Sequence, residues 1–258
     1  MISSDRKIEL VIDKDLNDID CLILAGGLGT RLNSLSIDKP KVLLPINNKP
    51  FIDILIDKLT YFGIRNFIIC VGYKKDQIIE HFNRYNYGCI IRFSEEEIPL
   101  GTGGAVKNAK PLINSDNFLV LNGDSFCNIN LKEFYDYHID KNALVTIANS
   151  QNDDNSKDYG NITLNSDNKI ISFNEKSSDH NLISAGIYLM KKEIFNLFPK
   201  LTSFSLEYDL FPRLCNYNVY KNRCFGYMTN KKVIDIGTPD RYIKANEVLK
   251  LNEDEMTI

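Results

Sequence analysis

The sequence predicts an α/β fold in which a doubly wound, mostly parallel sheet carries helices on both faces, with a smaller additional sheet layer. Three observations lead to this prediction. In the first 150 residues, short apolar runs alternate with segments whose apolar residues recur at helical spacing. A glycine-rich loop follows the first apolar run directly. After residue 150 the runs become shorter and more strand-like, which indicates a second sheet component.

The first half predicts five strands joined by crossover helices. Residues 66–71 are almost entirely apolar, as is typical of a strand covered on both faces. A proline near the start and Gly63 at the end mark a helix over residues 50–63. Ligands of such sheets bind at the carboxyl ends of the strands. The other expected strands are 21–25, 90–94, 118–121 and 143–148, and the other helices are 75–85, 103–113 and 131–139.

The second half predicts further strands with helices between them. We expect one domain over residues 21–258, with halves at 21–150 and 151–258, and an N-terminal extension at 1–20 without assigned chemistry. The expected strands are 161–164, 170–174, 184–190, 224–228 and 232–236, and the expected helices are 191–198, 207–216 and 240–251.

Composition narrows the functional classes. The 258 residues are 43% hydrophobic and carry a net charge of −3, which argues against a protein whose whole surface binds nucleic acid or an anionic membrane. Six cysteines are scattered singly, which favours reduced thiols and a cytoplasmic protein. No apolar stretch is long enough for a signal core or a membrane span.

The glycine-rich loop is the main functional feature. Gly26, Gly27 and Gly29 follow the first strand, and Thr30 and Arg31 add a hydroxyl and a cation. Glycines allow close backbone approach, and several N–H groups in one concavity suit phosphate oxygens. The loop and the nearby lysines, Lys39 and Lys41, therefore predict a nucleoside triphosphate site.

Several segments together resemble one enzyme family. Leu24-Ala-Gly-Gly-Leu-Gly-Thr-Arg31 followed by Lys39-Pro-Lys41 is similar to the signature of the sugar-1-phosphate nucleotidyltransferases, also called nucleotide-sugar pyrophosphorylases. Residues 96–107, 121–124 and 233–238 most resemble the D-glycero-D-manno-heptose 1-phosphate guanylyltransferases. The resemblance covers about residues 21–250 and implies a Rossmann-like fold of the nucleotide-diphospho-sugar transferase type. It assigns the first half to the nucleotide and the second half to the sugar phosphate.

The resemblance also implies catalytic roles. Arg31 grips the leaving β- and γ-phosphates, and a guanidinium suits bidentate phosphate contact. Lys41 contacts the α-phosphate, whereas Lys39 is the weaker candidate of the two lysines. Asp124 and Asp235 are the expected ligands of Mg²⁺, which uses few carboxylates together with substrate phosphates.

The nucleotide is expected between the glycine loop and the segment that begins at Glu96. The Glu96 carboxylate could accept the adjacent N1–H and N2–H₂ donors of guanine, although with Glu95 and Glu97 it could equally belong to a solvated acidic run. The expected nucleotide-binding residues are Leu24, Ala25, Gly26, Gly27, Gly29, Thr30, Glu96, Pro99, Gly101, Thr102, Asn122 and Gly123.

The sugar phosphate is expected over the second half. By resemblance, Gly160 lies in the sugar pocket, Glu175 binds sugar hydroxyls and Lys176 contacts the phosphate. Ser177 replaces the proline that commonly follows this Glu-Lys pair, and the alternative for the pair is a surface position at a strand end.

The expected function is transfer of a guanylyl group from GTP to a sugar 1-phosphate. The expected sugar phosphate is D-glycero-D-manno-heptose 1-phosphate, and the product would serve surface polysaccharide synthesis. The alternatives are a mannose- or glucose-1-phosphate nucleotidyltransferase using GTP, UTP or CTP, and a catalytically inactive regulatory module. An NAD-binding protein is disfavoured because the Gly-x-Gly-x-x-Gly spacing is absent. The expected partners are the nucleoside triphosphate and the sugar 1-phosphate, with a homo-oligomer left open.

Overall fold

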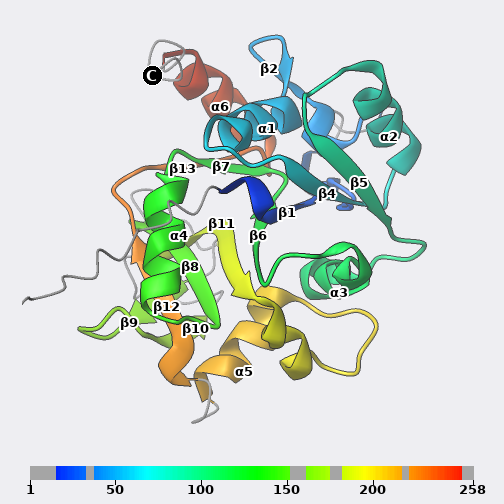
Figure 1. Ribbon diagram of the computed structural model, residues 1–258. Helices are drawn as coiled ribbons and strands as arrows, with labels where there is room; N and C mark the ends of the chain where they lie inside the picture. Colours follow the sequence, from blue (N-terminus) through cyan, green and yellow to red (C-terminus); the bar gives the residue numbers. More distant parts are fainter. Residues whose placement is uncertain (1–15, 33–37, 152–160, 175–181, 217–220, 252–258) are drawn as a thin grey trace, which may run out of the picture.

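The computed structural model of the chain describes residues 16–32, 38–151, 161–174, 182–216 and 221–251. A nine-stranded sheet crosses the molecule, and its main path runs β10-β9-β11-β6-β1-β4-β5 (Figure 1). Strand β1 (Asp20–Leu24) pairs in parallel with β4 (Asn66–Val71) on one side and β6 (Asn117–Asn122) on the other. Strand β5 (Ile90–Glu95) continues the parallel part next to β4. The predicted doubly wound α/β fold is confirmed.

The second half adds its strands to the same sheet through β11 (Leu182–Lys191). This strand runs antiparallel to β6 and also to β8 (Val145–Gln151), which in turn pairs in parallel with β12 (Cys224–Met228). Strands β9 (Asn161–Leu164) and β10 (Ile170–Asn174) form the outer antiparallel part. The pairing of β6 with β11 therefore joins the two halves directly.

Two small antiparallel sheets add to the central sheet. One pairs β7 (Ser125–Cys127) with β13 (Val233–Asp235), and the other pairs β2 (Pro45–Ile46) with β3 (Lys49–Pro50). The first of these sheets brings Asp235 opposite Ser125, beside Asp124. It therefore places two distant aspartates next to each other.

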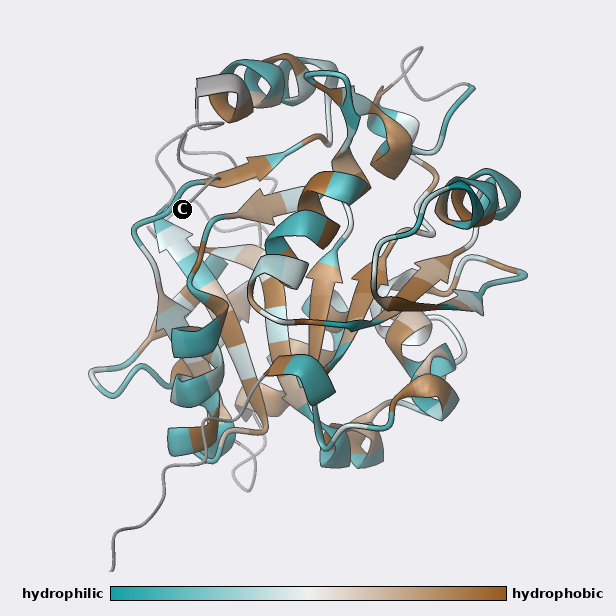
Figure 2. Ribbon diagram, turned by 45° about the horizontal axis from the view of Figure 1, so that its top comes forward, coloured by the Kyte–Doolittle hydropathy of each residue, from teal (hydrophilic) through white to brown (hydrophobic). Residues whose placement is uncertain are grey.

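Helices cover both faces of the central sheet, and two apolar cores lie between helices and sheet. The strands are apolar along their length because alternate side chains enter opposite cores: Ile23 belongs to one core and Leu22 to the other. Figure 2 shows hydrophobic strands inside and hydrophilic helix surfaces outside. The first core is covered by α1 (Phe51–Tyr61), α2 (Lys75–Arg84), α4 (Leu131–Asp140) and α6 (Pro239–Leu251), and the second by α3 (Gly101–Asn108), α5 (Phe211–Asn216) and η6 (Leu206–Leu210).

The short helical turns refine the expected boundaries. Residues expected as one helix over 103–113 form α3 and then a 3-10 turn, because Pro111 cannot donate the backbone hydrogen bond that an α-helix needs. The segment expected as a helix over 191–198 is a 3-10 helix. The turns are η1 (Leu16–Asp18), η3 (Lys41–Leu43), η4 (Lys110–Leu112), η5 (Lys192–Leu197) and η7 (Lys221–Arg223).

The strand order reverses at β1. The chain leaves β1 toward β4 on one side, and β6 later returns to its other side. Loops diverge at such a switch point, and the crevice between them is where ligands of open α/β sheets bind. The glycine-rich loop follows β1, and Asn122 ends β6.

The structure also shows the state of the cysteines and the character of the helices. All six cysteines are free thiols, five of them buried. Among the described residues, no helix combines the length and the apolar character needed to span a membrane.

His138 on α4 is a buried neutral histidine outside the crevice. It is 1% exposed, and its ring nitrogens lie 2.7 Å from Thr146 Oγ1 and 3.3 Å from Asn117 Oδ1. Burial, together with the charges of Lys191 and Arg223, lowers its pKa from 6.5 to about 4.

This histidine predicts a loss of stability in mild acid. Between pH 6.5 and about 4 the unfolded chain binds a proton that folded His138 does not, so the free energy of unfolding should fall by about 3 kcal/mol across this range. Urea unfolding at pH 7.5 and 4.5 measures the loss. The neutral variant His138→Gln should lose distinctly less over the same interval, and an equal loss in both proteins would contradict the prediction.

Candidate active site

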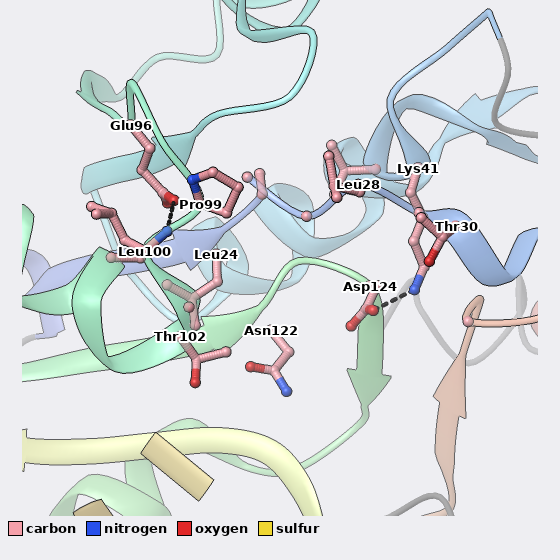
Figure 3. Close-up of a pocket in the computed structure, with 18 of the residues that line it drawn as sticks. Leu24, Leu28, Thr30, Lys41, Glu96, Pro99, Leu100, Thr102, Asn122 and Asp124 are labelled. Carbon is pink, nitrogen blue, oxygen red and sulfur yellow. Dashed lines mark hydrogen bonds and ion pairs between the residues drawn. The ribbon is translucent and has the colours of Figure 1, made fainter. Parts of the chain in front are cut away.

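A pocket of about 410 Å³ opens at the switch point, where the loops after β1, β5 and β6 meet (Figure 3). It gathers most of the nucleotide-site residues expected from the sequence. The lining residues are Leu24, Ala25, Gly26, Gly27, Leu28, Gly29, Thr30, Arg31, Lys41, Val42, Glu96, Pro99, Leu100, Gly101, Thr102, Ala105, Asn122, Asp124 and Gly237.

The glycine loop needs glycine at two positions for different reasons. At Gly26, an added Cβ would lie 2.8 Å from Glu96 Oε1 and 3.3 Å from the backbone nitrogen of Gly72, so no larger side chain fits. Gly29 has φ of 65°, in the left-handed region that favours glycine. The chain then turns through residues 30–32, and this turn brings Thr30 and Arg31 to the pocket.

The structure separates the two candidate lysines. Lys41 begins the 3-10 turn η3, and its ammonium forms an ion pair with Asp124 at the pocket wall (Figure 3). Lys39 is exposed and does not line the pocket. Lys41 therefore lies in the pocket wall, where its contact with the α-phosphate stays a prediction, whereas Lys39 lies outside the pocket lining.

Asp124 lies just after β6 and is half-buried. Its Oδ1 accepts a hydrogen bond from Ser125 Oγ at 3.1 Å, and its Oδ2 faces Lys41. Burial alone would raise its pKa, but the charges of Lys41 and Arg31 and the hydrogen bonds outweigh burial and hold the pKa below the ordinary value. The carboxylate is therefore ionised at neutral pH.

Asp235 lies beside Asp124 rather than in the pocket wall itself. The backbone N–H of Ile236 donates to the carbonyl of Asp124 at 3.0 Å, which locks the two strands together. The Asp235 side chain is 8% exposed, accepts the N–H of Gly237 at 2.8 Å, and faces Arg241 at 3.5 Å. A Cβ at Gly237 would lie 2.7 Å from Asp235 Oδ1 and 3.7 Å from Lys41 Nζ, so both side chains flank this glycine.

The two aspartates fit a magnesium site by their chemistry. Both offer carboxylate oxygens, the donors that Mg²⁺ prefers, and adjacent strands hold them side by side. Each carboxylate also faces a cationic side chain, Lys41 or Arg241, so its negative charge is balanced within the protein.

The Glu96 side chain points in a different direction from those of its acidic neighbours. Glu95 and Glu97 both pair with Lys75, at 2.9 and 3.0 Å, on the outside of the loop. Glu96 instead turns into the pocket, where its Oε2 accepts the N–H of Leu100 at 3.2 Å (Figure 3). Burial raises its pKa, and the hydrogen bond from Leu100 opposes this effect. The solvated-run alternative therefore describes Glu95 and Glu97 but not Glu96.

The remaining expected nucleotide residues take different positions. Thr102 lines the pocket, but its hydroxyl donates to Glu207 Oε2 at 2.5 Å and accepts from the N–H of Leu206 at 2.9 Å. Asn122 lines the pocket at the end of β6. Gly123 is buried against β1, where a Cβ would lie 2.6 Å from the carbonyl oxygen of Leu24, and it does not line the pocket.

Sequence reasoning missed part of the lining. Leu28 is the variable position inside the glycine loop, and Gly237 follows Asp235 in the segment already singled out, so both carried a usable signal. Nothing in the local pattern distinguished the apolar residues that close the walls. These missed lining residues are Leu28, Val42, Leu100, Ala105 and Gly237.

The expected sugar-phosphate residues Gly160, Glu175 and Lys176 lie outside the described residues. Their roles stay predictions. The second half does reach the pocket through a described residue, because Gly237 lines it. The carbonyl of Phe204 also accepts the N–H groups of Gly103 and Gly104, at 2.9 and 3.1 Å, next to the lining residue Thr102.

Curated relatives match most of the chain. A D-glycero-alpha-D-manno-heptose 1-phosphate guanylyltransferase from Aneurinibacillus thermoaerophilus is 34% identical over 90% of this chain and 99% of its own. One from Campylobacter jejuni is 37% identical over 87% and 97%. Mannose-1-phosphate guanyltransferase from Saccharomyces cerevisiae is 34% identical over 90% of this chain and 64% of its own.

A solved structure shows the same architecture. HddC from Yersinia pseudotuberculosis, also solved complexed with GMP-PN, superposes with a TM-score of 0.78 at 35% identity, covering 90% of this chain and 99% of that one. The nucleotidyl transferase family model matches residues 20–251. On this evidence the chain belongs to the nucleotidyl transferase family.

Proposed function

We propose that this enzyme joins GTP to a sugar 1-phosphate, D-glycero-D-manno-heptose 1-phosphate, giving a GDP-sugar and pyrophosphate for surface polysaccharide synthesis. The observation that supports the proposal most is the pocket at the switch point. One cavity there holds the glycine loop with Arg31, the ion pair of Lys41 and Asp124, and the inward carboxylate of Glu96. The relatives at 34% and 37% identity support the choice of heptose and guanine.

The reaction is an in-line displacement at the α-phosphorus. A phosphate oxygen of the sugar 1-phosphate attacks, the bond from the α-phosphorus to the bridging oxygen of the β-phosphate breaks, and pyrophosphate leaves. Both substrates are highly anionic, so the protein acts mainly by positioning and by charge stabilisation. Arg31 neutralises the leaving β- and γ-phosphates, and Lys41 stabilises the charge that develops on the α-phosphate.

Asp124 and Asp235 would hold Mg²⁺. When bound, the ion would neutralise phosphate oxygens and orient the triphosphate. The protein's own contribution at this point is to keep both carboxylates together on paired strands, with Asp124 ionised.

Glu96 is proposed to recognise guanine. Its Oε2 is partly used by Leu100, yet a carboxylate has about four acceptor positions, which leaves capacity for the N1–H and N2–H₂ of the base. Because the group is half-buried in the pocket, these hydrogen bonds would form away from bulk water.

Glu96→Gln should therefore weaken the binding of GTP more than the binding of UTP. The amide keeps one acceptor for Leu100 but replaces the other with a donor, so KM for GTP should rise about 10- to 100-fold, as is typical of a lost hydrogen bond to a charged group. Steady-state kinetics with GTP and UTP measure the change. The matched control is Glu97→Gln at the exposed neighbour, and equal GTP kinetics for the two variants would remove Glu96 from base recognition.

The proposed function itself is tested by pyrophosphate release. Four nucleoside triphosphates are crossed with heptose, mannose and glucose 1-phosphates, with Mg²⁺ or with EDTA. We expect the highest kcat/KM for GTP with D-glycero-D-manno-heptose 1-phosphate and loss of turnover in EDTA. If no pair turns over, the enzyme assignment fails. If kcat/KM is higher with UTP than with GTP, the role in guanine recognition given to Glu96 is refuted.

Mannose 1-phosphate is the second candidate substrate. Mannose-1-phosphate guanyltransferases from several fungi are 34–35% identical to this chain, as close as one of the heptose enzymes, although the chain covers only 62–64% of their length. The same assay separates the two sugars.

A further inference from the structure

Glu207 lies beside the pocket in η6 and is a carboxylate that receives three hydroxyl groups. Its Oε2 accepts from Thr102 Oγ1 at 2.5 Å and from Ser205 Oγ at 2.8 Å, and its Oε1 accepts from the Tyr188 hydroxyl at 3.0 Å. Thr102 belongs to α3 and lines the pocket, whereas Tyr188 is a buried residue of β11. One carboxylate therefore links the nucleotide half to the second half.

In this cluster, the donor and the acceptor of each hydrogen bond can be assigned. Ser205 Oγ already accepts the backbone N–H groups of Glu207 and Tyr208, each at 3.1 Å. A hydroxyl has one proton and two lone pairs, so Ser205 can only donate its proton to the carboxylate. An ionised carboxylate accepts only, so Tyr188 must also donate to Glu207.

The hydrogen bond from Tyr188 to Glu207 also determines how the Asn122 amide is oriented. Since its single proton goes to Glu207, the Tyr188 oxygen can only accept from its other neighbours, Ser184 Oγ at 3.4 Å and the Asn122 amide. The Asn122 nitrogen faces β11: a Cβ at Gly186 would lie 2.9 Å from Nδ2.

The Asn122 oxygen consequently points away from β11. Figure 3 shows Asn122 beside Thr102, with the amide oxygen on the Thr102 side. This oxygen is buried and has no hydrogen-bond partner among the described residues, although the residue lines the pocket. A buried acceptor without a partner is costly, so it indicates a place where a ligand supplies a donor.

We propose that Glu207 is a positioning residue: through Tyr188 it orients the Asn122 amide so that Oδ1 accepts a hydrogen bond from a ring hydroxyl of a bound substrate. The inference rests on the proposed function. Phosphate oxygens carry no proton to donate once ionised, and the guanine donors are taken by Glu96. Apart from the second N2–H of guanine, the remaining donors are hydroxyl groups, which both the ribose of the nucleotide and the sugar of the second substrate offer.

Glu207→Gln should reverse this orientation while keeping the shape. Because Ser205 must donate, the glutamine oxygen stays on the Ser205 side and its NH₂ faces Tyr188. Tyr188 then gives its proton to Asn122, whose amide turns and presents Nδ2 to the substrate. We expect KM for one substrate to rise about tenfold with kcat within about threefold of wild type.

The experiment uses steady-state kinetics and calorimetric GTP binding on wild type, Glu207→Gln and the matched control Glu193→Gln, which removes the same charge from a surface pair with Arg223. A rise in KM for GTP that disappears with 2′-deoxy-GTP or 3′-deoxy-GTP identifies a ribose hydroxyl. A rise in KM for the sugar 1-phosphate identifies a sugar hydroxyl. Unchanged KM for both substrates, or a loss of kcat and Tm without a change in KM, overturns the proposal.

A double-mutant cycle with Tyr188→Phe tests the connection between the residues. Phenylalanine removes the hydroxyl through which Glu207 acts, so Glu207→Gln should change KM less than twofold further in the Tyr188→Phe background. If the effects of Glu207→Gln and Tyr188→Phe on KM multiply in the double variant, the proposed connection between Glu207 and Tyr188 is refuted. A wild-type chain that turns over no substrate pair refutes the proposed function, whereas an active wild type with an unaffected Glu207→Gln variant refutes only this inference.

Discussion

Lys41→Ala is expected to lower kcat by about 10²- to 10³-fold, the effect typical of losing one preorganised group that stabilises transition-state charge. The Lys41 ammonium lies at the pocket wall, paired with Asp124 and half-buried in the 3-10 turn η3. Charge on the α-phosphate grows as the sugar phosphate attacks, so the loss should appear mainly in kcat rather than in KM for GTP. Pyrophosphate-release kinetics under saturating substrates measure it.

The matched control is Lys39→Ala. Lys39 lies two residues away, is exposed and does not line the pocket, so its variant should stay within about threefold of wild type. Melting temperatures of both variants check folding, since removal of Lys41 leaves Asp124 without its ion pair. Near wild-type turnover of Lys41→Ala would remove this lysine from the reaction.

The second large effect is expected at Asp235. Asp235→Asn should lower kcat by about 10²-fold or more and raise the Mg²⁺ concentration needed for half-maximal rate, because an amide binds Mg²⁺ less well than a carboxylate. The asparagine oxygen can still accept the N–H of Gly237, so the β7–β13 sheet should persist. Kinetics against Mg²⁺ and calorimetric Mn²⁺ binding in the presence of GTP measure the two parts of the effect.

Asp240→Asn is the control for this variant. Asp240 is an exposed residue in the first turn of α6, five positions after Asp235, and its role there is that of a helix-start residue. We expect unchanged Mg²⁺ dependence. If Asp235→Asn also keeps the wild-type Mg²⁺ dependence and kcat, a metal-binding role for Asp235 is refuted.

Most of the regular elements could be predicted because their pattern is local. Strand β4 occupies the expected residues 66–71, since a run buried on both faces is apolar at nearly every position. Strand β12 also matches the expected residues 224–228. The three-residue strand β7 and the hairpin of β2 and β3 were not expected, because strands this short have too few residues to show a period.

Site residues differed in how far a motif could identify them. Lys41 and Asp124 were singled out by the motifs that carry them, and the structure brings them together across 83 positions of sequence. Glu207 was not singled out. Its segment shows only an ordinary helical pattern, and its role comes from hydroxyls on Thr102 and Tyr188, which belong to distant elements.

By itself the sequence determined the alternation of strands and helices and the chemistry of the glycine loop, because both depend on neighbours a few positions away. The resemblance named Glu96 and the pair of Asp124 and Asp235, but only the tertiary structure showed that Glu96, and neither Glu95 nor Glu97, enters the pocket and that Asp235 lies beside Asp124. The first outcome depends on Lys75, which pairs with Glu95 and Glu97 outside the pocket. The second depends on the pairing of β7 with β13, which sets Asp235 opposite Ser125. Side-chain direction in a loop and pairing between distant strands are set by packing across the whole chain, and no local pattern contains that information.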